Sequence, residues 1–97
     1  MIDVAPAHLE TVRRILAARV PTCEVRAFGS RVGGTPKPYS DLDLAVVAAA
    51  RLDAEALRLL REDFEESDLP FRVDVLDWHA VGPEFRAVIA RRFEVLR

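Results

Sequence analysis

The sequence has 97 residues, enough for one domain with a modest core and too few for a second domain with its own substrate pocket. Its 14 basic and 16 acidic side chains leave a net charge of −2, without the basic excess of proteins that bind duplex nucleic acid. The single cysteine, Cys23, excludes an internal disulfide and a cysteine-based zinc site. Because no leader-like segment or apolar run of about 20 residues occurs, we expect a cytoplasmic protein.

The first half of the chain predicts a helix, a strand, a loop and a second strand. Apolar residues three and four apart predict an amphipathic helix that begins near Pro6 and ends before Pro21. Alternating polar and apolar residues predict a strand over 24–28. Glycine and proline make 33–40 a loop, and 41–48 starts with alternation and is predicted to be the next strand.

The second half predicts a helix, a strand, a helix and a short final strand. Asp53 is the expected N-cap of a helix that closes before Pro70, and 71–76 is the third strand. Pro83 opens the last helix, and 94–96 adds a short strand. Three apolar residues are expected on the buried side of that last helix: Phe85, Val88 and Ile89.

This order predicts one domain over 1–97 of the α/β (α+β) class, with a small mixed sheet. Each strand has one apolar face and one charged face, as a sheet covered by helices on one face only would have. The charged residues would then line the open face.

Three aspartates form a candidate cation site on that face. Asp41 and Asp43 are two apart on one strand, so their side chains project from the same side. Two adjacent carboxylates repel each other, and a bound Mg²⁺ or Mn²⁺ would relieve that repulsion. Asp74 on another strand could supply a third carboxylate, as in two-metal sites whose ions lie roughly 3.5–4 Å apart.

Simpler interpretations of the aspartates stay open. Asp41 and Asp43 could be the solvated edge of a strand, and Asp74 could pair with Arg72. Asp77 is a rival third acid, but it should point to the opposite face from Asp74 and cap the next turn.

Gly29 and Ser30 form a candidate phosphate site where the first strand ends. A glycine there permits a tight turn, and the following N–H groups and the Ser30 hydroxyl would donate toward one point. Arg31 adds a positive charge beside them. The alternatives are that Ser30 only caps a helix and that Arg31 is a surface charge.

Gly29-Ser30, ten intervening residues and Asp41-Leu42-Asp43 form a GS-x10-DxD pattern. This pattern resembles the signature of the DNA polymerase β-like nucleotidyltransferase superfamily. Almost the whole chain, with Val73-Asp74-Val75 as the strand of the third acid, is similar to the minimal nucleotidyltransferase (MNT) antitoxins, whose usual partners are HEPN toxins. The chain departs from that pattern at 33–36, where relatives more often continue with Arg-Gly.

The resemblance implies a role for each motif residue. Asp41 and Asp43 would bind two Mg²⁺ ions, and Asp74 would bind the catalytic ion and assist deprotonation of the attacking hydroxyl. Gly29 and Ser30, with Arg31 beside them, would bind the triphosphate of ATP. The implied reaction transfers AMP from ATP to a tyrosine hydroxyl of a HEPN toxin and silences its ribonuclease activity, within a hetero-oligomer.

Two alternative functions remain at this point. The first is an antitoxin that binds and occludes the toxin without chemistry. The second is nucleotidyl transfer to a small molecule such as an antibiotic, although a chain of this length lacks a second domain to build the acceptor cleft.

Overall fold

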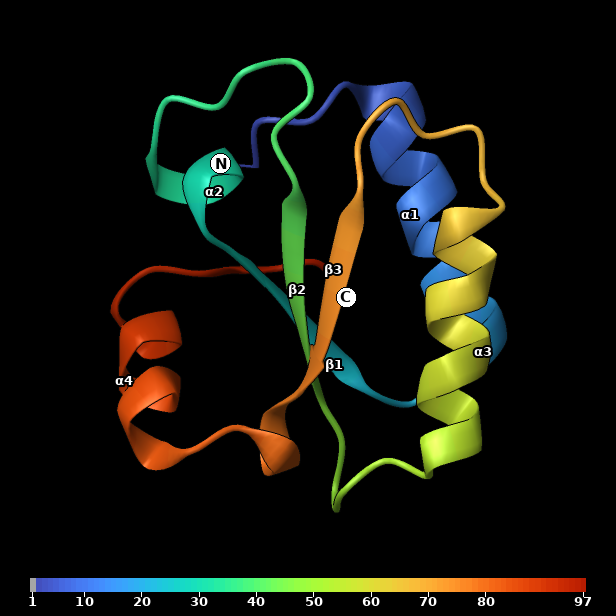
Figure 1. Ribbon diagram of the computed structural model, residues 1–97, viewed down its shortest axis with the longest axis vertical. Helices are drawn as coiled ribbons and strands as arrows, with labels where there is room; N and C mark the ends of the chain where they lie inside the picture. Colours follow the sequence, from blue (N-terminus) through green and yellow to red (C-terminus); the bar gives the residue numbers. More distant parts are fainter. Residues whose placement is uncertain (1) are drawn as a thin grey trace.

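The computed structural model describes residues 2–97, and its elements follow the predicted order (Figure 1). These residues form four α-helices and four strands, with a 3₁₀ turn at Trp78–Ala80: α1 (Pro6–Arg19), β1 (Glu24–Phe28), α2 (Ser30–Gly33), β2 (Leu42–Val47), α3 (Ala54–Glu65), β3 (Val73–Asp77), α4 (Pro83–Arg91) and β4 (Glu94–Val95). Within 2–97, no helix combines the length and the apolar character needed to cross a membrane.

The four strands form one mixed sheet in the order β3-β2-β1-β4. β1 is antiparallel to both of its neighbours, whereas β2 and β3 are parallel and are joined by the crossover helix α3. Because parallel strands need such a crossover, the chain brings two segments about 30 residues apart side by side, with β3 at the edge of the sheet. The mixed sheet confirms the predicted fold class.

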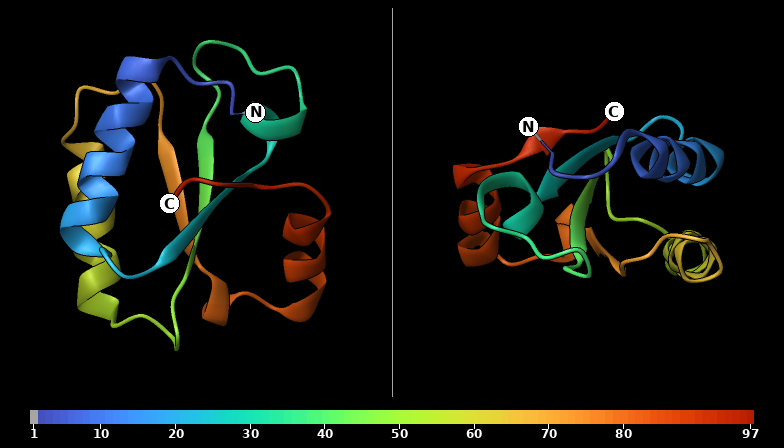
Figure 2. Two further views of the ribbon diagram at one scale, coloured as in Figure 1. Left: turned by 180° about the vertical axis from the view of Figure 1, so that it is seen from behind. Right: turned by 90° about the horizontal axis from the view of Figure 1, so that it is seen from above.

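The main core lies between the sheet and the pair α1 and α3 (Figure 2). The apolar stripe of each helix meets the apolar face of the strands, and each fully buried side chain contributes about 1.5–3 kcal/mol. Its completely buried members are Val12, Leu16, Val25, Ala27, Leu42, Leu44, Val46 and Leu60. Alternate strand residues fill this core, which leaves the intervening residues for the other face.

The prediction that helices pack on one face only is wrong in one respect, because α4 packs against the other face. Ile89 of α4 is completely buried against Phe28 and Ala45, in a small second cluster. Phe85 and Val88, which we expected on the buried side of this helix, are 43% and 49% exposed. Ile89 is the buried residue of α4, so this helix covers the second face less completely than α1 and α3 cover the first.

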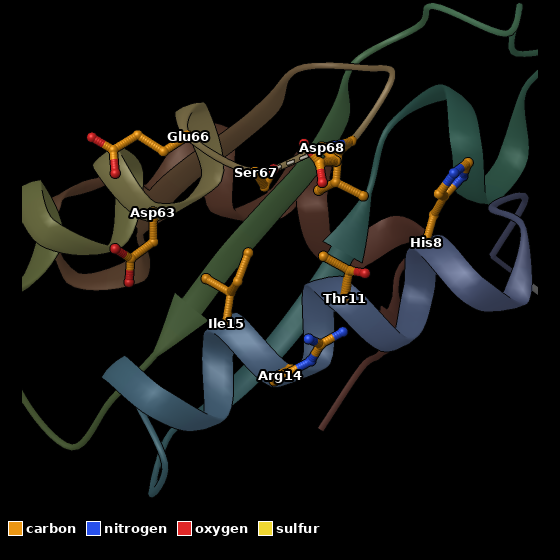
Figure 3. Close-up of a pocket in the computed structure, with 9 residues that line it drawn as sticks. His8, Thr11, Arg14, Ile15, Asp63, Glu66, Ser67 and Asp68 are labelled. Atoms are coloured by element: carbon orange, nitrogen blue, oxygen red, sulfur yellow. Dashed lines mark hydrogen bonds between the residues drawn. The ribbon is translucent and has the colours of Figure 1, made fainter.

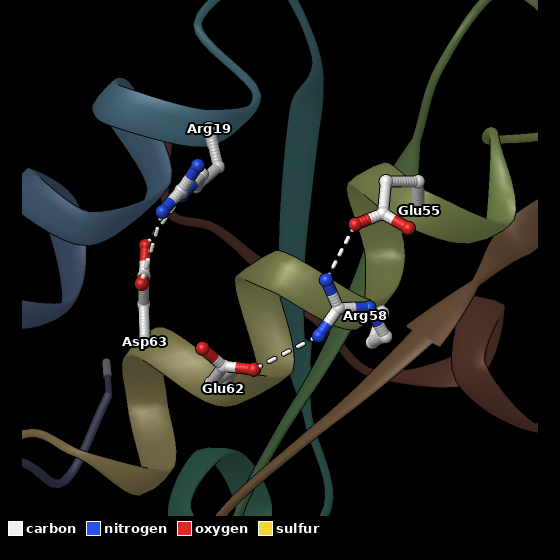
Figure 4. A network of polar contacts seen from close by, with 5 residues as sticks. All are labelled: Arg19, Glu55, Arg58, Glu62 and Asp63. Atoms are coloured by element: carbon white, nitrogen blue, oxygen red, sulfur yellow. Dashed lines mark hydrogen bonds and ion pairs between the residues drawn. The ribbon is translucent and has the colours of Figure 1, made fainter.

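Polar contacts add little to this packing. The Arg19 guanidinium on α1 lies 2.6 Å from an Asp63 carboxylate oxygen on α3, and Arg58 contacts Glu55 and Glu62 along α3 (Figure 4). All of these side chains are solvent-accessible, so each pair is worth about 0–1 kcal/mol. The helices are held to the sheet by their apolar faces.

The helix starts follow local sequence signals. α1 and α4 begin with proline, whose missing N–H costs nothing at a first helical position. Asp53 occupies the predicted N-cap position of α3, but its side chain makes no capping hydrogen bond.

Candidate active site

The sheet brings two of the three aspartates directly together. In the parallel pair β2–β3, Asp43 is the register partner of Asp74, and adjacent strands lie about 4.8 Å apart. Asp41 is the residue before β2 and is two positions from Asp43. The three aspartates therefore lie at the same end of the neighbouring strands β2 and β3, although Asp74 follows Asp43 by 31 residues in sequence.

The electrostatic surroundings of Asp43 reflect this crowding. Burial of the carboxyl is the largest cause that raises the pKa of Asp43, from its ordinary value of 3.8 to about 6. The negative charges of Asp74 and Asp41 raise it further, whereas the positive charge of Arg72 opposes the shift. A nearby cation would therefore favour the ionised form of Asp43.

The three aspartate side chains are not grouped as a metal-binding site. Within residues 2–97, no three His, Cys, Asp or Glu side chains are grouped so as to hold a metal ion. The Asp41 carboxylate lies 3.5 Å from the Arg72 guanidinium. The donor chemistry fits Mg²⁺, which prefers carboxylate oxygens, but coordination by all three acids would require their side chains to rotate.

The alternative pairing of Arg72 with Asp74 is not what the structure contains, because the Arg72 guanidinium pairs with Asp41. Asp77 is 4% exposed and accepts hydrogen bonds from the N–H groups of Leu52 and His79. The expectation that Asp77 caps the turn after β3 is confirmed. Its carboxylate is committed there, and it does not compete with Asp74.

Gly29 brings the Gly29-Ser30 turn against Asp43. It has φ +82°, a conformation that side-chain-bearing residues rarely adopt, and it is the N-cap residue of the one-turn helix α2. A Cβ at this position would overlap the Asp43 carboxylate. Ser30 is exposed beside it, and α2 lacks a side-chain cap, so the helix-cap alternative for Ser30 is not supported.

Arg31 is placed differently from both of its predicted roles. It is 6% exposed, and its guanidinium donates to the carbonyl oxygens of Asp3, Lys37, Pro38 and Ser40. It also lies 4.4 Å above the Phe71 ring. Four of the five guanidinium donors are used in these bonds, so Arg31 anchors the loop that leads into Asp41 and has one donor left for the predicted phosphate contact.

A hollow of about 430 Å³ lies next to the Gly29-Ser30 turn, between α2 and α4. The exposed sides of Phe85 and Val88 line it, and Arg92 is its one charged residue. Sequence reasoning missed Arg92 because nothing local connects it with Gly29. Only the packing of α4 brings the two together.

A second hollow of about 540 Å³ lies between α1 and α3 (Figure 3). His8 and Arg14 reach it from α1, and Asp63 reaches it from α3. These helices cover the opposite face of the sheet from Asp43, so this hollow is separate from the three acids.

Comparison with known proteins gives the class of the chain. The family model described as the nucleotidyltransferase domain matches residues 9–95, and the chain therefore belongs to this family. A relative from Haemophilus influenzae, named probable protein adenylyltransferase MntA, is 46% identical over 96 residues. That alignment covers 99% of this chain and 84% of the relative.

Solved structures share the fold. One chain from a toxin–antitoxin crystal structure with AMP-PNP has a TM-score of 0.76 at 27% identity, covering 92% of this chain and 72% of that chain. Another, from a complex of tri-AMPylated Shewanella oneidensis HEPN toxin with its MNT antitoxin, has a TM-score of 0.71 at 25% identity, covering 94% and 70%. These similarities confirm the resemblance that the GS-x10-DxD pattern indicated.

Proposed function

We propose that this protein is a Mg²⁺-dependent adenylyltransferase antitoxin that transfers AMP from ATP to a tyrosine hydroxyl of a HEPN toxin. One observation carries the proposal: Asp43 lies beside Asp74 and against Gly29, in a chain 46% identical to a named protein adenylyltransferase. The AMP-PNP in one related structure and the AMPylated toxin in another support the choice of nucleotide and partner.

The proposed reaction forms a bond between the tyrosine oxygen and the α-phosphorus of ATP. The bond from that phosphorus to the bridging oxygen breaks, pyrophosphate leaves, and the hydroxyl proton passes to a base or to water. Bound Mg²⁺ would neutralise the charge that develops on the phosphates. Such a transfer needs positioning and charge neutralisation, and it needs no nucleophilic side chain from this chain.

Each site residue has a task in this proposal. Asp41, Asp43 and Asp74 would hold the metal ions, and Asp74 would also accept the hydroxyl proton. Gly29 and Ser30 would donate hydrogen bonds to the terminal phosphates, since the first N–H groups of a helical turn have no partner within it. The partner would bring the acceptor tyrosine, in line with the AMPylated toxin of the related complex.

The experiment is transfer of label from α-labelled ATP to the cognate HEPN toxin, with Mg²⁺, by wild-type protein and Asp43→Asn. We expect labelled toxin with wild-type protein and at least a 100-fold slower transfer with the variant. Asp68→Asn, which changes an exposed aspartate outside the site, is the matched control and should label normally. Equal labelling by Asp43→Asn would refute the assignment.

The same variant separates catalysis from occlusion. An enzyme whose chemistry silences the toxin loses neutralisation with Asp43→Asn, measured as toxin ribonuclease activity at a fixed ratio of the two proteins. Full neutralisation by a variant that transfers no label would favour the occluding antitoxin.

A further inference from the structure

Arg92 is held against α2 by a long-range contact. It is the C-cap residue directly after α4, and its Nη1 donates to the Gly33 carbonyl oxygen at 2.9 Å. The two residues are 59 positions apart in sequence. The contact therefore fixes the guanidinium against α2.

Gly33 leaves the space that this guanidinium occupies. A Cβ built on Gly33 would overlap three atoms of the Arg92 side chain: Cδ, Nη1 and Nε. Gly33 does not have a positive φ, so its backbone conformation does not itself require glycine. The Arg92 side chain therefore occupies the space that a side chain at position 33 would fill.

Arg92 also has guanidinium N–H donors that its bond to Gly33 does not use. A guanidinium has five N–H donors, and the hydrogen bond to Gly33 uses one. The side chain is exposed, and the salt bridges of residues 2–97 involve other arginines. Arg31, next to Ser30 in sequence, is by contrast buried and bound to four carbonyl oxygens.

We propose that Arg92, and not Arg31, is the arginine that binds the phosphates of the nucleotide at the Gly29-Ser30 turn. This inference rests on the proposed function, because it assumes that a triphosphate binds there. Arg92 and Ser30 line the same hollow, and a guanidinium donates in a fork that matches phosphate oxygens. The cation reaches the turn from the end of α4, through space that Gly33 leaves open.

Binding of the α,β-methylene analogue of ATP, which cannot transfer AMP, tests this role in the presence of Mg²⁺ and without a partner. Isothermal titration calorimetry should give at least a tenfold higher Kd for Arg92→Ala and a smaller increase for Arg92→Lys. Arg91→Ala, which removes the neighbouring exposed arginine outside the hollow, is the matched control and should bind like wild type.

A second variant moves the cation instead of removing it. The double variant Gly33→Arg with Arg92→Ala places a guanidinium in the same region from α2, and we expect it to recover most of the lost affinity. A merely structural tie between α4 and α2 would not be restored in this way. Circular dichroism of each variant checks that the domain is folded.

The outcomes separate the two proposals. If wild type binds the analogue and Arg92→Ala binds it equally well, the role of Arg92 is refuted and the proposed function stands. If the lost affinity returns with neither Arg92→Lys nor the double variant, Arg92 acts through packing and the inference is wrong. If folded wild-type protein does not bind the analogue, the proposed function fails and this inference fails with it.

Discussion

The backbone of Gly29 lies directly against the carboxylate of Asp43. Phe28 and Asp43 are register partners in the antiparallel pair β1–β2, so the residue after Phe28 passes beside the acid. Gly29 turns there with φ +82°, and a Cβ would overlap the Asp43 Oδ2. The Gly29-Ser30 turn and Asp43 are therefore one structural unit, and each constrains the other.

Gly29→Ala should damage both parts of this unit. The variant strains a positive φ, at a cost of about 1 kcal/mol or more, and pushes the Asp43 carboxylate away from Asp74. We expect a lower melting temperature and at least a 100-fold loss of AMP transfer. Gly82→Ala is the matched control, because φ is −68° there and open space surrounds the glycine. Normal transfer by Gly29→Ala would show that the contact with Asp43 is unimportant.

Asp43→Asn should stabilise the protein in the absence of divalent cations above pH 6. The raised pKa of about 6, against 3.8 ordinarily, means that folded wild type holds a proton that the unfolded chain releases between these values. The contribution of Asp43 to stability is thus largest below pH 3.8, falls as pH rises to about 6, and stays low above it. The full shift corresponds to about 3 kcal/mol, which solvent screening of the half-buried side chain reduces to about 1 kcal/mol.

Thermal unfolding with EDTA measures this effect. We expect the melting temperature of Asp43→Asn to exceed that of wild type by about 4–8 °C at pH 7.5, with the difference shrinking at pH 4.5. Asp68→Asn should not change the pH dependence. A wild type that gains stability as pH rises from 4.5 to 6, relative to Asp43→Asn, would contradict the assignment.

Mg²⁺ should reverse the order of stability. A cation at the three aspartates favours the ionised form of Asp43, so it should raise the melting temperature of wild type at pH 7.5 and raise that of Asp43→Asn much less. The stabilisation should weaken at pH 5, because protons then compete with the ion for Asp43. Equal stabilisation of both proteins at both pH values would place the ion elsewhere.

Arg31→Lys should destabilise the domain although it keeps the charge. An ammonium cannot serve the four carbonyl oxygens that the guanidinium fork reaches, so we expect a loss of about 2 kcal/mol and a melting temperature roughly 10 °C lower. Arg91→Lys provides the control. An unchanged melting temperature with weakened ATP binding would instead support the original assignment of Arg31 to the nucleotide.

Asp74 and Asp77 offer a matched pair on one strand. Asp77→Asn replaces a buried carboxylate that accepts hydrogen bonds from two backbone N–H groups. It should lower the free energy of unfolding by about 1–2 kcal/mol without changing Mg²⁺ affinity. Asp74→Asn should abolish Mg²⁺-dependent transfer and leave stability nearly unchanged. Calorimetry and thermal unfolding of both variants check this contrast. If instead Asp77→Asn abolishes Mg²⁺-dependent transfer and Asp74→Asn lowers stability, Asp77 and not Asp74 is the third acid.

Much of the site was predictable because it depends on local geometry. The two-residue period of a strand puts Asp41 and Asp43 on one side, and it separates Asp74 from Asp77 in the same way. Glycine before serine at a strand end predicts the turn into α2, where the structure has it. These inferences need no knowledge of how distant segments pack.

Tertiary structure decided what depends on distant contacts. Arg31 looks like a phosphate ligand in sequence, but the loop at 37–40 folds over it and takes its donors. Arg92 reaches Gly33 only because α4 packs on the second face of the sheet. Strand alternation is set by neighbouring residues, so the sequence alone determined which acids share a face and where the turn lies. Whether an arginine has donors left for a phosphate depends on the carbonyl oxygens that the folded chain places around it. Only the packed structure decided this for Arg31 and Arg92.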